Sequence, residues 1–236
     1  MKISFTIFFT VLLVGFLFKQ FNSTSDTMFG KLLSIFGDSQ TPEEKFWNWF
    51  DTNRERVQSS LYISKDKIND ALIEEIGKKV KGYNKAISWE MGQAQDGVWE
   101  LILGCDGIKE GIPQVEKLVN SAPKLPNWRI LKYRQPRPIE NTNRIAYEGL
   151  SINPDEIMVY FEKNDETSKF DIAVFFKHYS ETDKRYMSCG FLYLDEILGE
   201  YNVMTKVGSI EFLELTESID KSKLLSLAEF QKAFNK

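Results

Sequence analysis

Cysteine and histidine are scarce in this chain of 236 residues, which has two cysteines and one histidine. Cys105 and Cys189 lie far apart in the sequence, so they form neither a close pair of zinc ligands nor a disulfide scaffold. His178 stands alone, which excludes a metal site built from several histidines. We therefore expect no metal and no cofactor. Two separate buried thiols are the preferred interpretation, and a single bridge stays open for an exported protein.

The chain also lacks the motifs that bind nucleotides or carry out catalysis. It has no G-x-G-x-x-G, no P-loop and no H-E-x-x-H sequence. No G-x-S-x-G elbow or catalytic-cysteine signature surrounds the serines and the cysteine that follow His178. The formal net charge of −4 gives no overall attraction to nucleic acid, and we expect no nucleic-acid partner. The sequence therefore indicates no particular reaction.

Long apolar runs are absent except at the beginning of the chain. A predominantly apolar run of sixteen residues extends from Ile3 to Phe18, with Lys2 before it and Lys19 after it. As a helix this run would be about 24 Å long, which is shorter than the roughly 30 Å hydrocarbon layer. The Lys19 side chain can extend to the interface and reduce this mismatch. We expect residues 1–21 to form a hydrophobic helix that anchors the protein.

This anchor would bind the lipid bilayer through residues 3–18 as a single pass, with the body of the protein outside the cytoplasm. Two alternatives stay open. A cleaved signal peptide would release a secreted protein, and the serines and threonine at 23–25 are the best candidate for its cleavage region. A translation start at Met28 would give a cytoplasmic form. Residues 22–40 are mostly small and polar, and we expect them to form a linker.

Residues 41–236 predict an α+β domain that begins with two helices. Thr41, Pro42 and Glu44 form a capping box with proline at the first helical position, which predicts a helix from Thr41. We expect a second helix over 65–81, capped by Ser64. Its apolar positions recur at every fourth residue. These positions are Ile68, Leu72, Ile76 and Val80.

Two β-β-α-β units are expected to follow, over 83–138 and 145–215. We expect their helices to pack on one side of antiparallel sheet. In the second unit the spacing from Met187 to Tyr201 favours a helix, although its first turns also alternate like a strand. The predicted elements of the first unit are strands near 87–91, 99–103 and 128–133 and a helix from Pro113. Those of the second are strands at 156–162, 169–176 and 209–215, followed by a tail helix at 224–234.

A few polar residues are candidates for a site. Asp106, between two glycines at a strand end, marks a binding loop or an ordinary turn, and the turn is the preferred interpretation. His178 follows a strand and is more typical of a surface residue than of a general base. Asp195, Glu196 and Glu200 have helical spacing, and we expect them to lie on a solvated face.

The clearest local charge cluster is basic and lies at 129–144, interleaved with aromatic residues and prolines. Three interpretations are open: a charged edge that discourages strand-to-strand aggregation, a patch that pairs with acidic loops of a partner, and a nucleic-acid platform. The plain charged edge is preferred. The cluster comprises Arg129, Lys132, Arg134, Arg137 and Arg144. For a binding role we single out Trp128, Lys132, Arg134, Arg137 and Asp106.

Several short motifs together resemble an uncharacterised family of bacterial proteins. They are the FWNWF motif at 46–50, the DGI motif at 106–108, the APKLPNW motif at 122–128 with RQPRP at 134–138, the LDEILGEY motif at 194–201 and the TKVGSI motif at 205–210. The resemblance covers roughly 41–215. No activity is assigned to that family, so it implies no catalytic role. Its members commonly begin near the equivalent of Met28. The resemblance therefore weakens the case that residues 1–27 have a physiological role.

The sequence favours a membrane-tethered or exported, non-enzymatic interaction domain with a protein partner. One alternative is an enzyme whose acidic residues are dispersed in the sequence, with Asp106, His178 and Glu200 as its best candidates. Another is an immunity or inhibitor protein that blocks a toxin through a charged surface. Convergence of the three candidate residues in a deep pocket would favour the enzyme.

Overall fold

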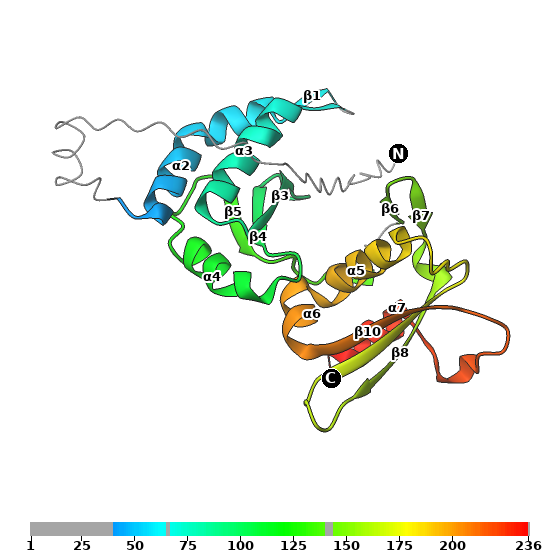
Figure 1. Cartoon of the computed structure of the whole chain (residues 1–236). Coiled ribbons are helices and arrows are strands. Elements are labelled where there is room, and N and C mark those ends of the chain that lie inside the picture. Colours follow the sequence, from blue (N-terminus) through cyan, green and yellow to red (C-terminus); the bar gives the residue numbers. More distant parts are fainter. Residues whose placement is uncertain (1–39, 65–66, 140–143, 236) are drawn as a thin grey trace.

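The computed structural model describes residues 40–64, 67–139 and 144–235 (Figure 1). The predicted anchor at 1–21 and nearly all of the predicted linker at 22–40 lie outside the described residues. Within the described part, no helix has both the length and the apolar composition that crossing a bilayer requires.

The first helix among the described residues, α2, spans Pro42–Ser60, and its capping box agrees with the prediction. The Thr41 hydroxyl accepts a hydrogen bond from the backbone N–H of Glu44 at 3.2 Å, and the Glu44 carboxylate accepts one from the N–H of Thr41 at 2.7 Å. These bonds satisfy two amides that have no partner inside the helix. The buried side chains of α2 include Phe46, Trp47 and Phe50.

The second predicted helix begins later than expected. α3 spans Asp70–Tyr83, and its N-cap is Asn69, whose side chain accepts from the N–H of Leu72 at 3.2 Å. The prediction of Ser64 as the cap was wrong, because Ser64 ends the short strand β1 (Tyr62–Ser64), which pairs with β2 (Lys67–Ile68). Leu72, Ile76 and Val80 are buried as the spacing predicts.

A three-stranded sheet forms the centre of the first unit. Its order is β3-β4-β5, with β3 antiparallel and β5 parallel to β4. A short 3-10 helix and α4 connect β4 to β5 and reverse the chain, which makes the third strand parallel to the second. The bounds are β3 Ser88–Gln93, β4 Trp99–Gly104, η1 Lys109–Gly111, α4 Ile112–Asn120 and β5 Trp128–Lys132.

The second unit repeats this order in β8, β9, α5 with α6, and β10, while β11 adds a fourth strand to its sheet and β6 and β7 form a separate hairpin. The order of the four-stranded sheet is β10-β9-β8-β11, with β8 antiparallel and β10 parallel to β9. The bounds are β6 Ile145–Tyr147, β7 Leu150–Ile152, η3 Pro154–Glu156, β8 Ile157–Lys163, β9 Phe170–Phe176, α5 Arg185–Leu198, α6 Glu200–Lys206, β10 Val207–Glu214, η4 Lys221–Lys223, β11 Leu225–Ser226 and α7 Leu227–Phe234.

The structure confirms the α+β fold class and both predicted β-β-α-β orders. The expectation of antiparallel sheet was too simple, since each main sheet contains one parallel pair. The predicted helix from Met187 to Tyr201 is interrupted at Gly199, which has φ +84° and separates α5 from α6. The tail helix starts at Leu227 rather than 224, because Ser226 and Glu229 form a capping box there.

The buried apolar side chains form two separate clusters. The first lies among α2, α3, α4 and the first sheet, and also includes Met204 from α6. The second lies among α5, α7 and the second sheet. Figure 1 shows α2, α3 and α4 grouped around the first sheet and α5, α6 and α7 grouped around the second. The two units meet at an interface, here called the seam, where polar side chains from β3, the loop after β4, α5 and α6 surround Arg134.

Candidate functional site

Arg134 lies at this seam and holds the two units together. β5 ends at Lys132, and the buried Tyr133 has φ +58°, so the strand pattern of alternating faces ends before Arg134. The guanidinium is surrounded by the carboxylates of two residues from each unit. Those of the first unit are Glu90 and Asp106, and those of the second are Asp195 and Glu200.

The geometry of these contacts is that of charge-assisted hydrogen bonds. Nη2 of Arg134 donates to Oδ1 of Asp106 at 2.8 Å, and Nη1 donates to Oδ2 of Asp195 at 3.1 Å. Nε of Arg134 donates to Oε1 of Glu90. The nearest oxygen of Glu200 is 3.8 Å from Nη1. One guanidinium therefore ties β3 and the loop after β4 to α5 and α6.

Glu200 is the most buried acid of this group, with 1% of its surface exposed. Its Oε1 accepts from the backbone N–H of Cys105 at 2.7 Å and of Asp106 at 2.9 Å. Its Oε2 accepts from the backbone N–H of Arg134 at 3.2 Å. A Cβ at Gly104 would collide with this carboxylate, so glycine is needed there. Glu200 thus satisfies amides at the ends of two strands of the first unit.

Burial raises the pKa of Asp195 to about 7, although the nearby Arg134 acts in the opposite direction. Burial also raises the pKa of Glu90. For Arg134 burial lowers the pKa, but the charges of Glu90, Glu200 and the other acids outweigh this and raise it overall. The seam therefore holds a permanent cation beside more acid than one cation neutralises, and Asp195 changes its protonation near neutral pH.

The seam contradicts the expectation that Asp195, Glu196 and Glu200 lie on a solvated face. Helical spacing alone suggested exposure, but α5 turns this face toward the first unit. Arg134 contacts Asp195, and the backbone N–H of Arg137 donates to the carbonyl of Glu196 at 2.7 Å. Nη1 of Arg137 also donates to the carboxylate of Glu196 at 3.3 Å.

The predicted basic cluster is largely used within the molecule. Arg129 pairs with Asp96 and Glu100. Lys132 pairs with Glu116 at 2.5 Å, and Nε of Arg144 donates to Asn153 at 3.0 Å. Trp128 belongs to the first core, where its ring packs against Phe50 and Trp99, so it does not line the surface. Among the five predicted binding residues, the structure brings Asp106 and Arg134 into contact and sets Lys132 and Arg137 at the same seam.

The predicted enzyme residues do not all converge. Asp106 and Glu200 meet at the seam, since Glu200 accepts from the N–H of Asp106. His178 is exposed in the turn after β9 and close to the start of α5. Glu200 follows the end of α5, a helix of 14 residues, which is about 20 Å long. His178 therefore lies near the opposite end of α5 from the seam.

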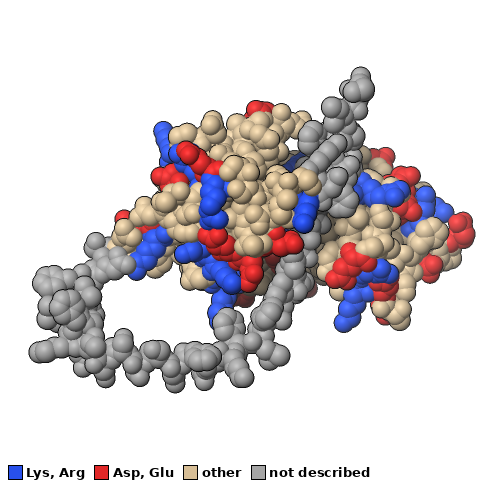
Figure 2. All heavy atoms as spheres, turned by 90° about the horizontal axis from the view of Figure 1, so that it is seen from above, with Lys and Arg blue, Asp and Glu red and all other residues tan. Residues whose placement is uncertain are grey.

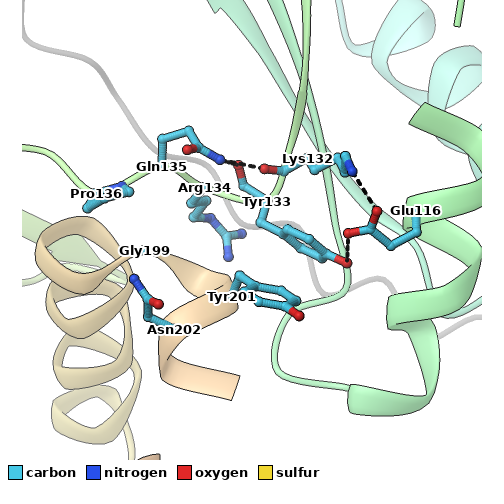
Figure 3. Close-up of a pocket in the computed structure, with 9 residues that line it drawn as sticks. All are labelled: Glu116, Lys132, Tyr133, Arg134, Gln135, Pro136, Gly199, Tyr201 and Asn202. Atoms are coloured by element: carbon cyan, nitrogen blue, oxygen red, sulfur yellow. Dashed lines mark hydrogen bonds and ion pairs between the residues drawn. The ribbon is translucent and has the colours of Figure 1, made fainter. Parts of the chain in front are cut away.

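A surface hollow of about 390 Å³ opens beside Arg134 (Figure 3). The rings of Tyr133 and Tyr201 lie next to each other in it, with centroids 5.1 Å apart, and they bring together β5 and α6. The hydroxyl of Tyr133 donates to Glu116 at 3.3 Å. The residues that line the hollow are Glu116, Lys132, Tyr133, Arg134, Gln135, Pro136, Gly199, Tyr201 and Asn202.

The two cysteines are free and buried in different places, as the preferred interpretation of the sequence expected. Cys105 lies in the first core, where its Sγ is 3.5 Å from Sδ of Met204. Burial raises the pKa of Cys105 to about 12 and that of Cys189 to about 11. Neither thiol is thus available as a thiolate near neutral pH.

Comparison with other proteins adds no family. The sequence matches no protein-family model and no curated protein. Within the described residues, no group of three or more histidine, cysteine or acidic side chains is arranged to hold a metal ion. Figure 2 shows that acidic and basic side chains lie side by side in small clusters on the face it presents, rather than in a field of one sign.

Proposed function

We propose that this chain is a non-enzymatic interaction domain, held at a membrane by residues 3–18, and that it binds a partner protein at the hollow beside Arg134. The single observation that carries this proposal is Tyr201. This residue is 45% exposed, and its ring packs against that of the buried Tyr133 in the hollow. Large aromatic residues in such positions supply much of the binding energy of protein interfaces.

The rigid setting of the hollow supports this role. Tyr133 is fixed by its position in the first core, and α6 is fixed by the hydrogen bonds of Glu200. A partner side chain would therefore meet preformed walls, which lowers the entropy that binding loses. The charged residues that line the hollow are two cations, Lys132 and Arg134, and one acid, Glu116, and they lie beside the rings of Tyr133 and Tyr201. We expect the partner to insert an aromatic side chain that packs on Tyr201.

Photo-cross-linking tests the binding role. A photoreactive residue replaces Asn202, which lines the hollow, in the full chain in its native membranes. We expect one discrete cross-linked protein, and we expect Tyr201→Ala to reduce its yield by about tenfold, which corresponds to about 1.4 kcal/mol. Tyr160→Ala is the matched control, because Tyr160 is 39% exposed on β8, away from the hollow. Equal yields from both variants would contradict the proposal.

Fractionation of the native protein with amino-terminal sequencing tests the tether separately. An uncleaved anchor predicts that the protein stays with the membrane and begins at Met1. Recovery of only a soluble product that begins at Met28 would refute the tether. It would leave the binding role of the hollow untouched, because Asn202 and Tyr201 belong to the folded domain.

A further inference from the structure

The outer edge of β10 is open. β10 is the last strand of its sheet, and among the described residues no strand pairs with its outer side. The N–H of Leu215 donates to the carbonyl of Phe176 at 2.8 Å, so the odd-numbered residues of β10 direct their amides toward β9. By the same alternation the amides of Ile210 and Phe212 point outward. Within the part of the chain that the structure describes, no strand pairs with the N–H and C=O groups of these two residues, which lie on a strand of eight residues.

Apolar side chains flank this open edge on both faces of the sheet. Phe212 packs against Phe191 of α5 with ring centroids 5.1 Å apart, and Met187 lies one turn before Phe191. Met187 and Phe191 are exposed, as is Leu213 on the opposite face of β10. A second hollow of about 370 Å³ lies at the end of the strand, lined by Tyr179, Glu181, Phe212, Leu213 and Glu214.

The charge of the edge is acidic. Glu211 and Glu214 are exposed on β10, and Glu181 is exposed beside its end. None of these three acids forms an ion pair with another described residue. A second copy of the chain is a poor occupant in the register that pairs Ile210 with Phe212 of the other copy, because it would place the two Glu211 side chains opposite each other. The charges instead fit a strand that carries lysine or arginine.

We propose that the β10 edge binds an extended, basic segment of a partner protein by adding it to the sheet as an antiparallel strand. Its backbone would pair with Ile210 and Phe212. Its apolar side chains would contact Phe191 on the face of Phe212, and its cations would face Glu211 on the opposite face of the strand. This surface is distinct from the hollow at Tyr201. Acidic side chains on an edge also discourage aggregation, and the experiment below separates the two roles.

The probe is an octapeptide of alternating lysine and valine, with its binding to the full chain in detergent micelles measured by fluorescence anisotropy. We expect saturable binding that weakens at least tenfold in the double variant Glu211→Lys, Glu214→Lys. Glu110→Lys is the control, because Glu110 is an exposed acid of the first unit. Equal weakening by the control variant, or no binding by the wild type, would overturn the proposal.

Backbone methylation of the probe tests strand addition itself. A peptide N-methylated at alternate residues loses one row of donors and gains bulk at one edge only. We expect one of the two possible methylation patterns to abolish binding and the other to preserve it. Equal binding of both methylated peptides would refute strand pairing.

Sedimentation of the chain alone tests the competing occupant. A stable dimer that Ile210→Pro disrupts, because proline removes an outward amide of β10, would show that a second copy occupies the edge and would overturn the assignment to a basic segment. Tyr201→Ala should leave peptide binding unchanged, so failure at β10 and failure at the hollow give different results.

Discussion

Replacing Arg134 with methionine should destabilise the protein more than any exposed charge replacement. The methionine removes the cation and keeps most of the apolar stem, so the change isolates the charge. The side chain of Arg134 is 11% exposed, and its contacts are four carboxylates. Removing one partner from a buried ion pair costs about 3–5 kcal/mol, because the remaining charge stays buried. We expect about 4 kcal/mol at pH 7 on the same basis.

Arg129→Met is the matched control. Arg129 also contacts two acids, Asp96 and Glu100, but its side chain is 42% exposed. Exposed ion pairs contribute about 0.2–1 kcal/mol, because water screens them. The two variants lose the same charge and the same number of methylenes, so the difference between them reports burial.

Urea unfolding of the full chain in detergent micelles, followed by two probes, measures the effect. All five tryptophans precede Arg134 and belong to the first unit, so their fluorescence follows that unit, while circular dichroism follows both. We expect coincident transitions in the wild type and separated transitions in Arg134→Met, because the variant loses the main tie across the seam.

The pH dependence distinguishes a charge effect from a packing effect. Without Arg134 the native carboxyls of Glu90 and Asp195 hold protons more strongly, so they become neutral as the pH falls. The loss of stability caused by Arg134→Met should therefore be about 1–2 kcal/mol smaller at pH 5 than at pH 7. A loss at pH 7 that is no larger than that of Arg129→Met would refute the reasoning. So would a large loss that is the same at both pH values.

Three further predictions concern the seam and the cores. The pKa of Asp195 is raised from 3.8 to about 7 in the folded protein, so between these values the native state holds more protons than the unfolded state. The contribution of Asp195 to stability should therefore fall as pH rises from 4 to 7. Asp195→Asn should flatten this part of the pH profile of urea unfolding. Gly199→Ala should destabilise the folded protein by about 1–3 kcal/mol, because Gly199 has φ +84° and a Cβ there would lie 2.8 Å from Cδ of Pro136. Gly82→Ala is the control, since Gly82 lies in α3 with open space around it. In the same denaturation assay it should be neutral or stabilise by up to about 1 kcal/mol. Cys105 and Cys189 should react with a thiol reagent at pH 8 only as fast as the protein unfolds, because both are buried with raised pKa values; rapid reaction of either thiol in the native protein would contradict their placement.

Features set by neighbouring residues could be predicted from the sequence. The Thr41 capping box needs only Glu44, three residues away, and it was found. The start of α3 was misplaced because Ser64 and Asn69 are both good caps. Asn69 also donates its side-chain amide to the carbonyl of Ser60 at 3.1 Å, a contact that depends on the hairpin between them. Local pattern does not reveal that second bond.

The seam could not be predicted, because its members are far apart in the chain. Glu200 has the spacing of an exposed helical acid, and its burial comes from amides of Cys105 and Arg134. Arg134 was identified as a binding candidate from its basic neighbours, but its partners Glu90 and Asp195 lie on other elements. One signal was available: Gly199 directly before Glu200 marks a break in the helix, where a side chain can turn toward another unit.

Hydrogen exchange on the full chain tests most directly whether the hollow beside Arg134 is a binding surface. The exchange of backbone amides is compared between the purified protein in detergent micelles and the protein in its native membranes. A bound partner predicts slower exchange in the membranes at residues 133–135 and 199–202, with Tyr201→Ala restoring the faster rate. Equal exchange rates at these residues in detergent micelles and in native membranes would contradict the proposed function.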